Sequence, residues 1–227
     1  MINSFKYKYN VSTNLRKQLV TVPTAIETAS GISFMGGRNV KSLIFTTDIA
    51  IVRNTNADAI LAVYPFTPDP AIMQAIHVAS DRPVFSGVGG GLTNGKRSAD
   101  MSLFAESWGS LGVIVNAPTS VETIKLINDV VDIPPIILTV VNTEVDFAEK
   151  FAAGIDVINV SGGYQTAQIV HTIRERYPQV PIIATGGHSD ESIKQTIAAG
   201  ANAITYNPPT TSSLFAQKMK EYREFGF

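Results

Sequence analysis

Short apolar runs alternate with mixed apolar and polar segments along the chain from Lys41 onward. The runs are rich in Val and Ile, which is typical of parallel strands that are covered on both faces. We predict strands at residues 42–46, 59–63, 84–88, 112–116, 136–140, 157–160, 182–185 and 203–206. The segments between them predict helices at residues 70–79, 97–108, 121–130, 145–153, 166–177 and 191–199, with a last helix at 214–225. Only the first crossover, around residues 49–55, is short for a full helix.

A turn of similar sequence recurs ahead of even-numbered strands. The chain reads Ala-Asp-Ala-Ile at residues 57–60, Ala-Gly-Ile-Asp-Val-Ile at 153–158 and Ala-Gly-Ala-Asn-Ala-Ile at 199–204. In each case a small residue ends a helix, and a short polar turn leads into a buried strand. Eight near-equal units favour an α/β fold of the (β/α)8 type, a TIM barrel. An open doubly wound sheet is the alternative, but no switch point in the strand order is evident.

Residues 1–40 do not follow this alternation. We therefore assign them to an N-terminal extension and residues 41–227 to the barrel, within one domain. Residues 14–29 have the pattern of one or two short helices interrupted near Pro23, and the glycines at 31, 36 and 37 predict a loop that carries Arg38. The extension either caps the bottom of the barrel or folds back toward its top.

Composition excludes several classes of function. The formal net charge of -1 gives no basic field for nucleic acid, and the absence of cysteine removes disulfides, thiolate nucleophiles and Cys-ligated metals. Charged and polar residues run through residues 1–22, so we expect neither a signal peptide nor a membrane span there. These features favour a cytoplasmic protein, with a homo-oligomer left open. The partner that we expect, a small anionic metabolite, is predicted from the loops described next.

Two glycine pairs follow neighbouring strands and precede helices: Gly162-Gly163 after residues 157–160, and Gly186-Gly187 after residues 182–185. In a TIM barrel the active site is built from the loops at the C-terminal ends of the strands. Bare backbone N–H groups at such turns can hold a phosphate or carboxylate, and Ser161 can add a hydroxyl. The alternative is that the glycines only permit tight turns with positive φ.

Three side chains of these loops are candidates for catalysis. Asp48 is the only carboxylate directly after a predicted strand, so it is our first candidate for the acid or base, although an N-cap is the other role it could have. His188, beside the second glycine pair, could shuttle a proton or simply face water. Lys96 lies in the long loop at residues 89–98, which could close as a lid over an anion or remain a solvated surface loop.

Other polar residues of the same loops could shape the substrate pocket, namely Tyr64, Asn116 and Asn207. A metal site is not expected, because the three histidines are scattered and two lie within predicted helices. No lysine falls inside or directly after a predicted strand, so a Schiff-base mechanism has no obvious nucleophile. We expect no cofactor.

The segments at residues 182–187 and 199–204 resemble the ribulose-phosphate-binding superfamily of TIM barrels. They are also similar to FMN- and nucleotide-binding barrels, in which the seventh strand likewise ends in a glycine pair. The resemblance implies that Gly186 and Gly187 grip a phosphate. The eighth turn departs from the pattern, because Pro208 and Pro209 remove two N–H donors from the place where the superfamily uses them.

Three hypotheses follow for the function. The first is an isomerase or lyase that acts on a small phosphorylated or carboxylated metabolite, with the anion on the glycine turns and proton transfer by Asp48 or His188. The second is an FMN-binding oxidoreductase with the FMN phosphate on the same turn. The third is a non-catalytic barrel that binds a metabolite.

Overall fold

The predicted strands form the wall of a closed barrel in the computed structural model, which describes residues 20–133, 135–187 and 189–225. Eight parallel strands pair in the order β10-β3-β4-β5-β6-β7-β8-β9, and β10 pairs with β3 to close the ring. The strands are β3 Ser42–Phe45, β4 Ala59–Ala62, β5 Val84–Gly89, β6 Gly112–Asn116, β7 Ile136–Val140, β8 Val157–Val160, β9 Ile182–Thr185 and β10 Ala203–Tyr206. The chain is a (β/α)8 barrel, as the sequence predicted.

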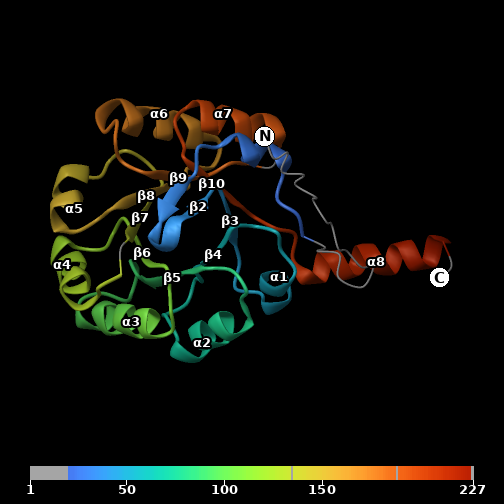
Figure 1. Ribbon diagram of the computed structural model, residues 1–227, viewed down its shortest axis with the longest axis horizontal. Helices are drawn as coiled ribbons and strands as arrows, with labels where there is room; N and C mark the ends of the chain where they lie inside the picture. Colours follow the sequence, from blue (N-terminus) through green and yellow to red (C-terminus); the bar gives the residue numbers. More distant parts are fainter. Residues whose placement is uncertain (1–19, 134, 188, 226–227) are drawn as a thin grey trace, which may run out of the picture.

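The crossover helices surround the barrel, as Figure 1 shows in a view along its axis. They are α1 Ile49–Arg53, α2 Pro70–Ala79, α3 Lys96–Ser107, α4 Val121–Val130, α5 Phe147–Ala153, α6 Thr166–Arg176, α7 Asp190–Ala198 and α8 Thr211–Phe225. The first is short, as expected, with five residues. The last does not lie against the barrel but points away from it (Figure 1). No helix in the described part of the chain is long and apolar enough to cross a membrane.

The turn that recurs before the even-numbered strands holds neighbouring strands together at the bottom of the barrel. The carboxylate of Asp156 accepts a hydrogen bond from the backbone N–H of Ile136 at 2.9 Å, and the N–H of Asp156 donates to the carbonyl of Ile136. Asn202 makes the same pair of bonds with Ile182, and Asp58 accepts from the N–H of Ser42. Each polar side chain therefore ties the start of its own strand to the start of the neighbouring strand.

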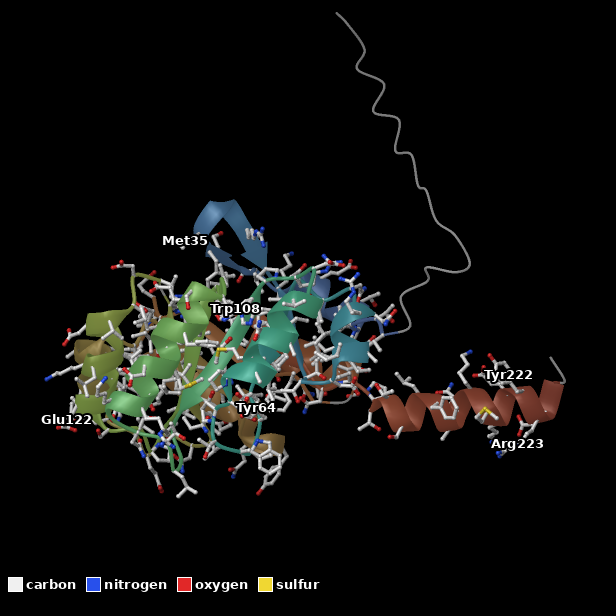
Figure 2. The ribbon with its side chains drawn as sticks, turned by 90° about the horizontal axis from the view of Figure 1, so that it is seen from below. Met35, Tyr64, Trp108, Glu122, Tyr222 and Arg223 are labelled. Carbon is white, nitrogen blue, oxygen red and sulfur yellow. The ribbon has the colours of Figure 1, made fainter. Side chains whose placement is uncertain are left out.

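The N-terminal extension closes the bottom of the barrel. Where the glycines predicted a loop, the chain forms a short antiparallel hairpin of β1 Ile32–Phe34 and β2 Arg38–Val40, with Gly36 and Gly37 at positive φ in the turn between them. Its apolar side chains pack on the inward side chains of the barrel strands, and the ring of Phe34 meets that of Phe85 edge-on at 5.1 Å. Figure 2 shows Met35, at the tip of the hairpin, standing beyond the end of the barrel.

This placement settles which end of the barrel the extension covers. Before the hairpin, a 3-10 helix at Thr24–Thr28 packs against α7, whereas the rest of the predicted helical segment, residues 14–19, lies outside the described residues. The side chain of Asn202, at the start of β10, donates to the hydroxyl of Ser30. The extension is thus a cap over the bottom, and the opposite end remains open for a site.

Side chains inside the barrel change character from bottom to top. The lower inward positions are apolar and pack with the hairpin, as Phe85, Ile114, Ile137, Val157 and Ile183 do. Two residues further along several strands, the inward positions are polar: Asn116, Thr139, Asn159 and Thr185. Because side chains of a strand alternate between its faces, these polar groups also point into the barrel. The polar upper layer forms the floor of the site.

Candidate active site

A hollow of about 460 Å3 opens at the end of the barrel where the strands finish, and we call it the central pocket. Figure 2 shows Tyr64, which follows β4, toward this end and Met35 at the other. The apolar side chains of its lining are Phe45, Leu61, Val63, Ala117, Pro118 and Val141. The polar side chains are Asn116, Thr139, Asn159, Ser161, Thr185, Thr205 and Asn207. Position, size and lining are those of a small-molecule site.

Strand register brings the polar side chains to one level. Asn116 pairs in register with Thr139 on β7, and Thr139 with Asn159 on β8. The Asn159 amide donates from Nδ2 to the Thr139 hydroxyl at 3.1 Å, while its Oδ1 is buried without a hydrogen-bond partner in the described part of the chain. On β10 the hydroxyl of Thr205 is likewise buried and unpartnered there. Buried polar atoms in folded proteins normally have partners, so these two oxygens leave hydrogen-bonding capacity unused at the pocket, as the hydroxyls of Ser98 and Thr119 do outside its lining.

The structure brings three of the expected pocket residues together and adds others. Asn116, Ser161 and Asn207 line the central pocket, although their role in binding substrate stays a prediction. Thr139, Asn159, Thr185 and Thr205 were missed, because we considered only residues that follow the strands. A signal was present: each is a polar residue at an inward position within an otherwise apolar run.

The glycine turns lie beside the pocket, and glycine is required at each of the four positions for a local reason. A Cβ on Gly186 would approach Cγ2 of Ile204 to 2.7 Å, so this position is needed for packing, and a Cβ on Gly162 would collide with Ile169. Gly163 and Gly187 have positive φ and lie at the surface, where their N–H groups donate to no group in the described part of the chain. Packing explains Gly162 and Gly186, and positive φ explains Gly163 and Gly187, as the alternative predicted; the N–H groups of the latter two are also available for an anion.

Hydroxyl groups connect these turns with the pocket. Ser161 and Thr185 immediately precede the two glycine pairs, and both line the central pocket. Their side-chain oxygens are 3.4 Å apart, so they can contact the same atom of a ligand. An anion between the turns would lie at the mouth of the pocket rather than at its floor.

Asp48 is occupied by structural contacts. Its carboxylate accepts from the N–H of Ala50 at 2.9 Å and of Ile51 at 3.4 Å, which caps α1. Hydrogen bonds from Thr211, at the start of α8, are the largest cause that holds the pKa of Asp48 below its usual value. Asp48 is not among the residues that line the central pocket. Its proposed part in proton transfer stays a prediction, and the capping role is what the geometry displays.

Of the remaining candidates, Lys96 and Tyr64 do not line the central pocket. Lys96 begins α3 and pairs with Asp100 at 2.9 Å, with 85% of its side chain exposed. Tyr64 lines a smaller hollow of about 160 Å3 beside the central pocket, where its hydroxyl accepts from the N–H of Asp69 at 2.8 Å and orders the β4–α2 loop. His188 lies outside the described residues.

Comparisons with known proteins were informative only at the level of structure. No family model matches the chain, and no curated protein matches it. Phosphonopyruvate hydrolase in complex with oxalate and Mg2+ superposes with a TM-score of 0.61 at 11% identity, over 82% of this chain and 84% of that one. A 2,3-dimethylmalate lyase, described as a member of the PEP mutase/isocitrate lyase superfamily, gives 0.62 at 14% identity, over 89% and 86%. Phosphoenolpyruvate phosphomutase from Streptomyces platensis subsp. rosaceus gives 0.60 at 14%, over 88% and 83%.

These matches correct one expectation. The resemblance drawn from residues 182–187 and 199–204 was right about the barrel. The superfamily that it named stays a prediction, and the 2,3-dimethylmalate lyase is described as a member of a different superfamily. At such low identity the likeness establishes the fold alone. We also expected no cofactor, and the phosphonopyruvate hydrolase structure, which holds Mg2+, contradicts that expectation. None of the three names a flavin, so the FMN alternative gains no support.

The described residues of the central pocket do not fit a Mg2+ site. Mg2+ in proteins is usually held through one or two carboxylates, whereas the polar side chains of this lining are amides and hydroxyls. No group of three or more His, Asp or Glu side chains that could hold a metal occurs within residues 20–133, 135–187 and 189–225. We therefore assign no metal ligands and derive no step through a metal.

Proposed function

We propose that the protein binds a small carboxylated or phosphorylated metabolite in the central pocket and acts on it as a lyase or mutase. The observation that carries this proposal is the pocket itself, at the C-terminal ends of the strands, with two buried oxygens that have no partner in the described part of the chain. The matching barrels support the class of reaction. Their names include a hydrolase of phosphonopyruvate, a lyase of 2,3-dimethylmalate and a phosphoenolpyruvate phosphomutase.

The anionic group of the metabolite would lie at the mouth of the pocket. The hydroxyls of Ser161 and Thr185 and the N–H groups of Gly163 and Gly187 are the donors available there. This arrangement needs no contribution from the eighth turn, where Pro208 and Pro209 lack N–H groups. Proton transfer would fall to His188 or Asp48, the two groups expected from the sequence.

A direct assay tests the proposal. Phosphonopyruvate and 2,3-dimethylmalate are incubated with the protein, with Mg2+ and with EDTA, and the products are followed by phosphorus and proton NMR. We expect turnover of at least one compound of this class, and a large increase in KM when Ser161→Ala and Thr185→Val are combined. Thr172→Val, which removes an exposed hydroxyl on α6, is the matched control and should leave KM unchanged. Failure of both compounds to bind or react would contradict the proposal.

A second candidate function is non-catalytic binding of the same class of metabolite. The observation in its favour is that no residue that lines the central pocket within the described ranges carries a titratable side chain. Calorimetry separates the two functions. Binding of a carboxylated or phosphorylated compound without turnover, under conditions in which the compound is chemically competent, would establish the binding role.

A further inference from the structure

Two unpartnered oxygens lie deep in the central pocket, below the donors at its mouth. Asn159 is 5% exposed and Thr205 is 3% exposed, so neither is solvated as a surface group would be. Both line the pocket, and neither Oδ1 of Asn159 nor Oγ1 of Thr205 has a hydrogen-bond partner in the described part of the chain. A buried acceptor without a donor costs folding free energy. A ligand that supplies the donor removes this cost, which favours its binding.

The Asn159 amide is oriented in the structure with its nitrogen toward β7. Its Nδ2 donates to the hydroxyl of Thr139, which directs Oδ1 away from that bond. Below it the inward positions are apolar, including Ile183 and Ala203, which belong to the cluster packed on the hairpin. Asn159 lines the pocket, so a group bound there is the donor that we consider for its unpartnered oxygen.

The charge of the floor restricts what can bind there. An inward carboxylate or phosphate would place its negative charge against the Asn159 carbonyl oxygen, and no cationic side chain lines the pocket within the described residues. A buried ammonium group would need a carboxylate partner, which the described lining does not supply. A hydroxyl is neutral, donates one hydrogen bond, and can accept another from Thr205.

We infer that the metabolite carries a hydroxyl group at the end opposite its anion, and that Asn159 and Thr205 bind this hydroxyl. The inference rests on the proposed function, because the anion at the glycine turns sets the direction of the ligand. The substrate class is then a hydroxycarboxylate or a hydroxyalkyl phosphate with its anionic head at the mouth and its hydroxyl at the floor.

Pairs of compounds that differ by one hydroxyl test this orientation. Calorimetry compares 4-hydroxybutyrate with butyrate, and 3-hydroxypropyl phosphate with propyl phosphate, on the full chain. We expect the hydroxylated member of at least one pair to bind about tenfold tighter or more, because a site built to bind a hydroxyl discriminates strongly against its absence. In Thr205→Val and Asn159→Leu the difference within that pair should collapse, whereas Thr172→Val should preserve it.

The outcomes separate this inference from the proposed function. If both members of every pair bind equally well, or if the preference survives in both floor variants, the inference is wrong while the proposed function stands. If no member of either pair binds, the proposed anion site has failed and the inference falls with it. Thr205→Val is nearly isosteric and keeps the test informative if Asn159→Leu does not fold; circular dichroism checks the fold of each variant.

Discussion

Asp48 illustrates at the scale of one residue how capping and catalysis compete as explanations. Its carboxylate accepts from the start of α1 and from Thr211 at the start of α8, and these bonds hold its pKa below the usual value. Because the pKa is lowered on folding, the resulting stabilisation is present above the unfolded value of 3.8 and is lost as the pH falls through the folded value. Asp48→Asn keeps an oxygen for capping but cannot take up a proton.

These properties predict a split between two variants of Asp48. Asp48→Ala should lower the free energy of unfolding by about 1 kcal/mol at pH 7, the usual cost of losing an N-cap, and the loss should fade below pH 3.8. Asp48→Asn should keep most of the stability and, if Asp48 moves the proton, lose turnover. Urea unfolding at the two pH values and the NMR assay measure the two effects. Full activity in Asp48→Asn would show that Asp48 is a cap and not a catalyst.

His77 is hydrogen-bonded to two buried serine hydroxyls in series, Ser110 and then Ser86. Its Nδ1 lies 2.8 Å from the carbonyl of Met73, so Nδ1 carries the proton and donates, and Nε2 accepts from the hydroxyl of Ser110 at 3.0 Å. The Ser86 hydroxyl, 2.7 Å from that of Ser110, completes the chain. Burial lowers the pKa of His77, since a charged ring would be desolvated here.

We predict that the partly buried His77, hydrogen-bonded to Ser110, makes the stability of the protein depend on pH. A histidine whose pKa is lowered on folding stabilises the protein above its unfolded value of 6.5, and this stabilisation is lost as the pH falls through the folded value. The wild type should therefore lose stability on acidification below pH 6.5, and His77→Gln should show a flatter profile. His171→Gln, at an exposed histidine beside Glu175, should follow the wild type. Thermal unfolding across this pH range measures the effect, and parallel profiles for all three proteins would contradict it.

Polar residues inside strands mark the limit of what could be predicted at this scale. We located Asn116, Ser161 and Asn207 because they follow apolar runs, but we missed Asn159 and Thr205. A single polar residue in an apolar strand can point either into the barrel or outward, and only the register of the neighbouring strands decides. The sequence shows that Asn159 and Thr205 each lie two positions after an apolar residue of the same strand. It does not show that they lie at the same height in the barrel, because that depends on how strands distant in sequence pair with one another.

At the scale of the element, the turn before the even-numbered strands can be tested by substitution. Asp156 directly precedes β8, and the residue that directly precedes β6 is Leu111. The backbone N–H of Leu111 donates to the carbonyl of Val84, but its apolar side chain cannot accept a hydrogen bond. Asp156→Leu therefore gives the turn before β8 the side chain found before β6. The change leaves the N–H of Ile136 without the Asp156 acceptor, which should cost about 1–3 kcal/mol. Asp129→Ala, which removes an exposed carboxylate on α4, should change stability by less than about 0.5 kcal/mol. Urea midpoints compare the two, and equal midpoints would show that the side-chain bond contributes nothing.

Strands were predictable from sequence where an apolar run was long enough to be recognised between two turns. The predicted strands at residues 112–116, 136–140, 157–160, 182–185 and 203–206 have the observed bounds, because apolar runs between short turns leave little freedom. The hairpin of β1 and β2 was predicted as a loop. Its strands have three residues each, too few for an alternation to be read, and it is stabilised by contacts with the barrel floor rather than by its own sequence.

At the scale of the whole molecule, two segments extend the barrel in opposite ways. The hairpin inserts Ile32 and Val40 among the inward side chains of the barrel strands. Helix α8 leaves the barrel in both views (Figures 1 and 2), and its side chains are largely exposed, with 67% for Phe215 and 50% for Tyr222. The first segment closes the bottom of the barrel, so that a ligand enters only from the end with the glycine turns. The second adds length without adding to the core.

The two segments should therefore differ sharply in what they contribute to stability. Ile32→Ala removes buried methyl groups from the contact between the hairpin and the barrel, and should lower the free energy of unfolding by about 2 kcal/mol. A chain that ends at Phe215 keeps the bonds of Thr211 to Asp48 and the packing of Leu214. It loses mainly exposed residues and two local ion pairs, Lys218 with Glu221 and Lys220 with Glu224. Exposed ion pairs contribute little, so the truncated chain should unfold within about 0.5 kcal/mol of the full chain. Urea unfolding measures both at one protein concentration. A large loss on truncation would mean that α8 packs against a surface in solution, and repeating the experiment at several concentrations would show whether that surface belongs to another copy of the chain.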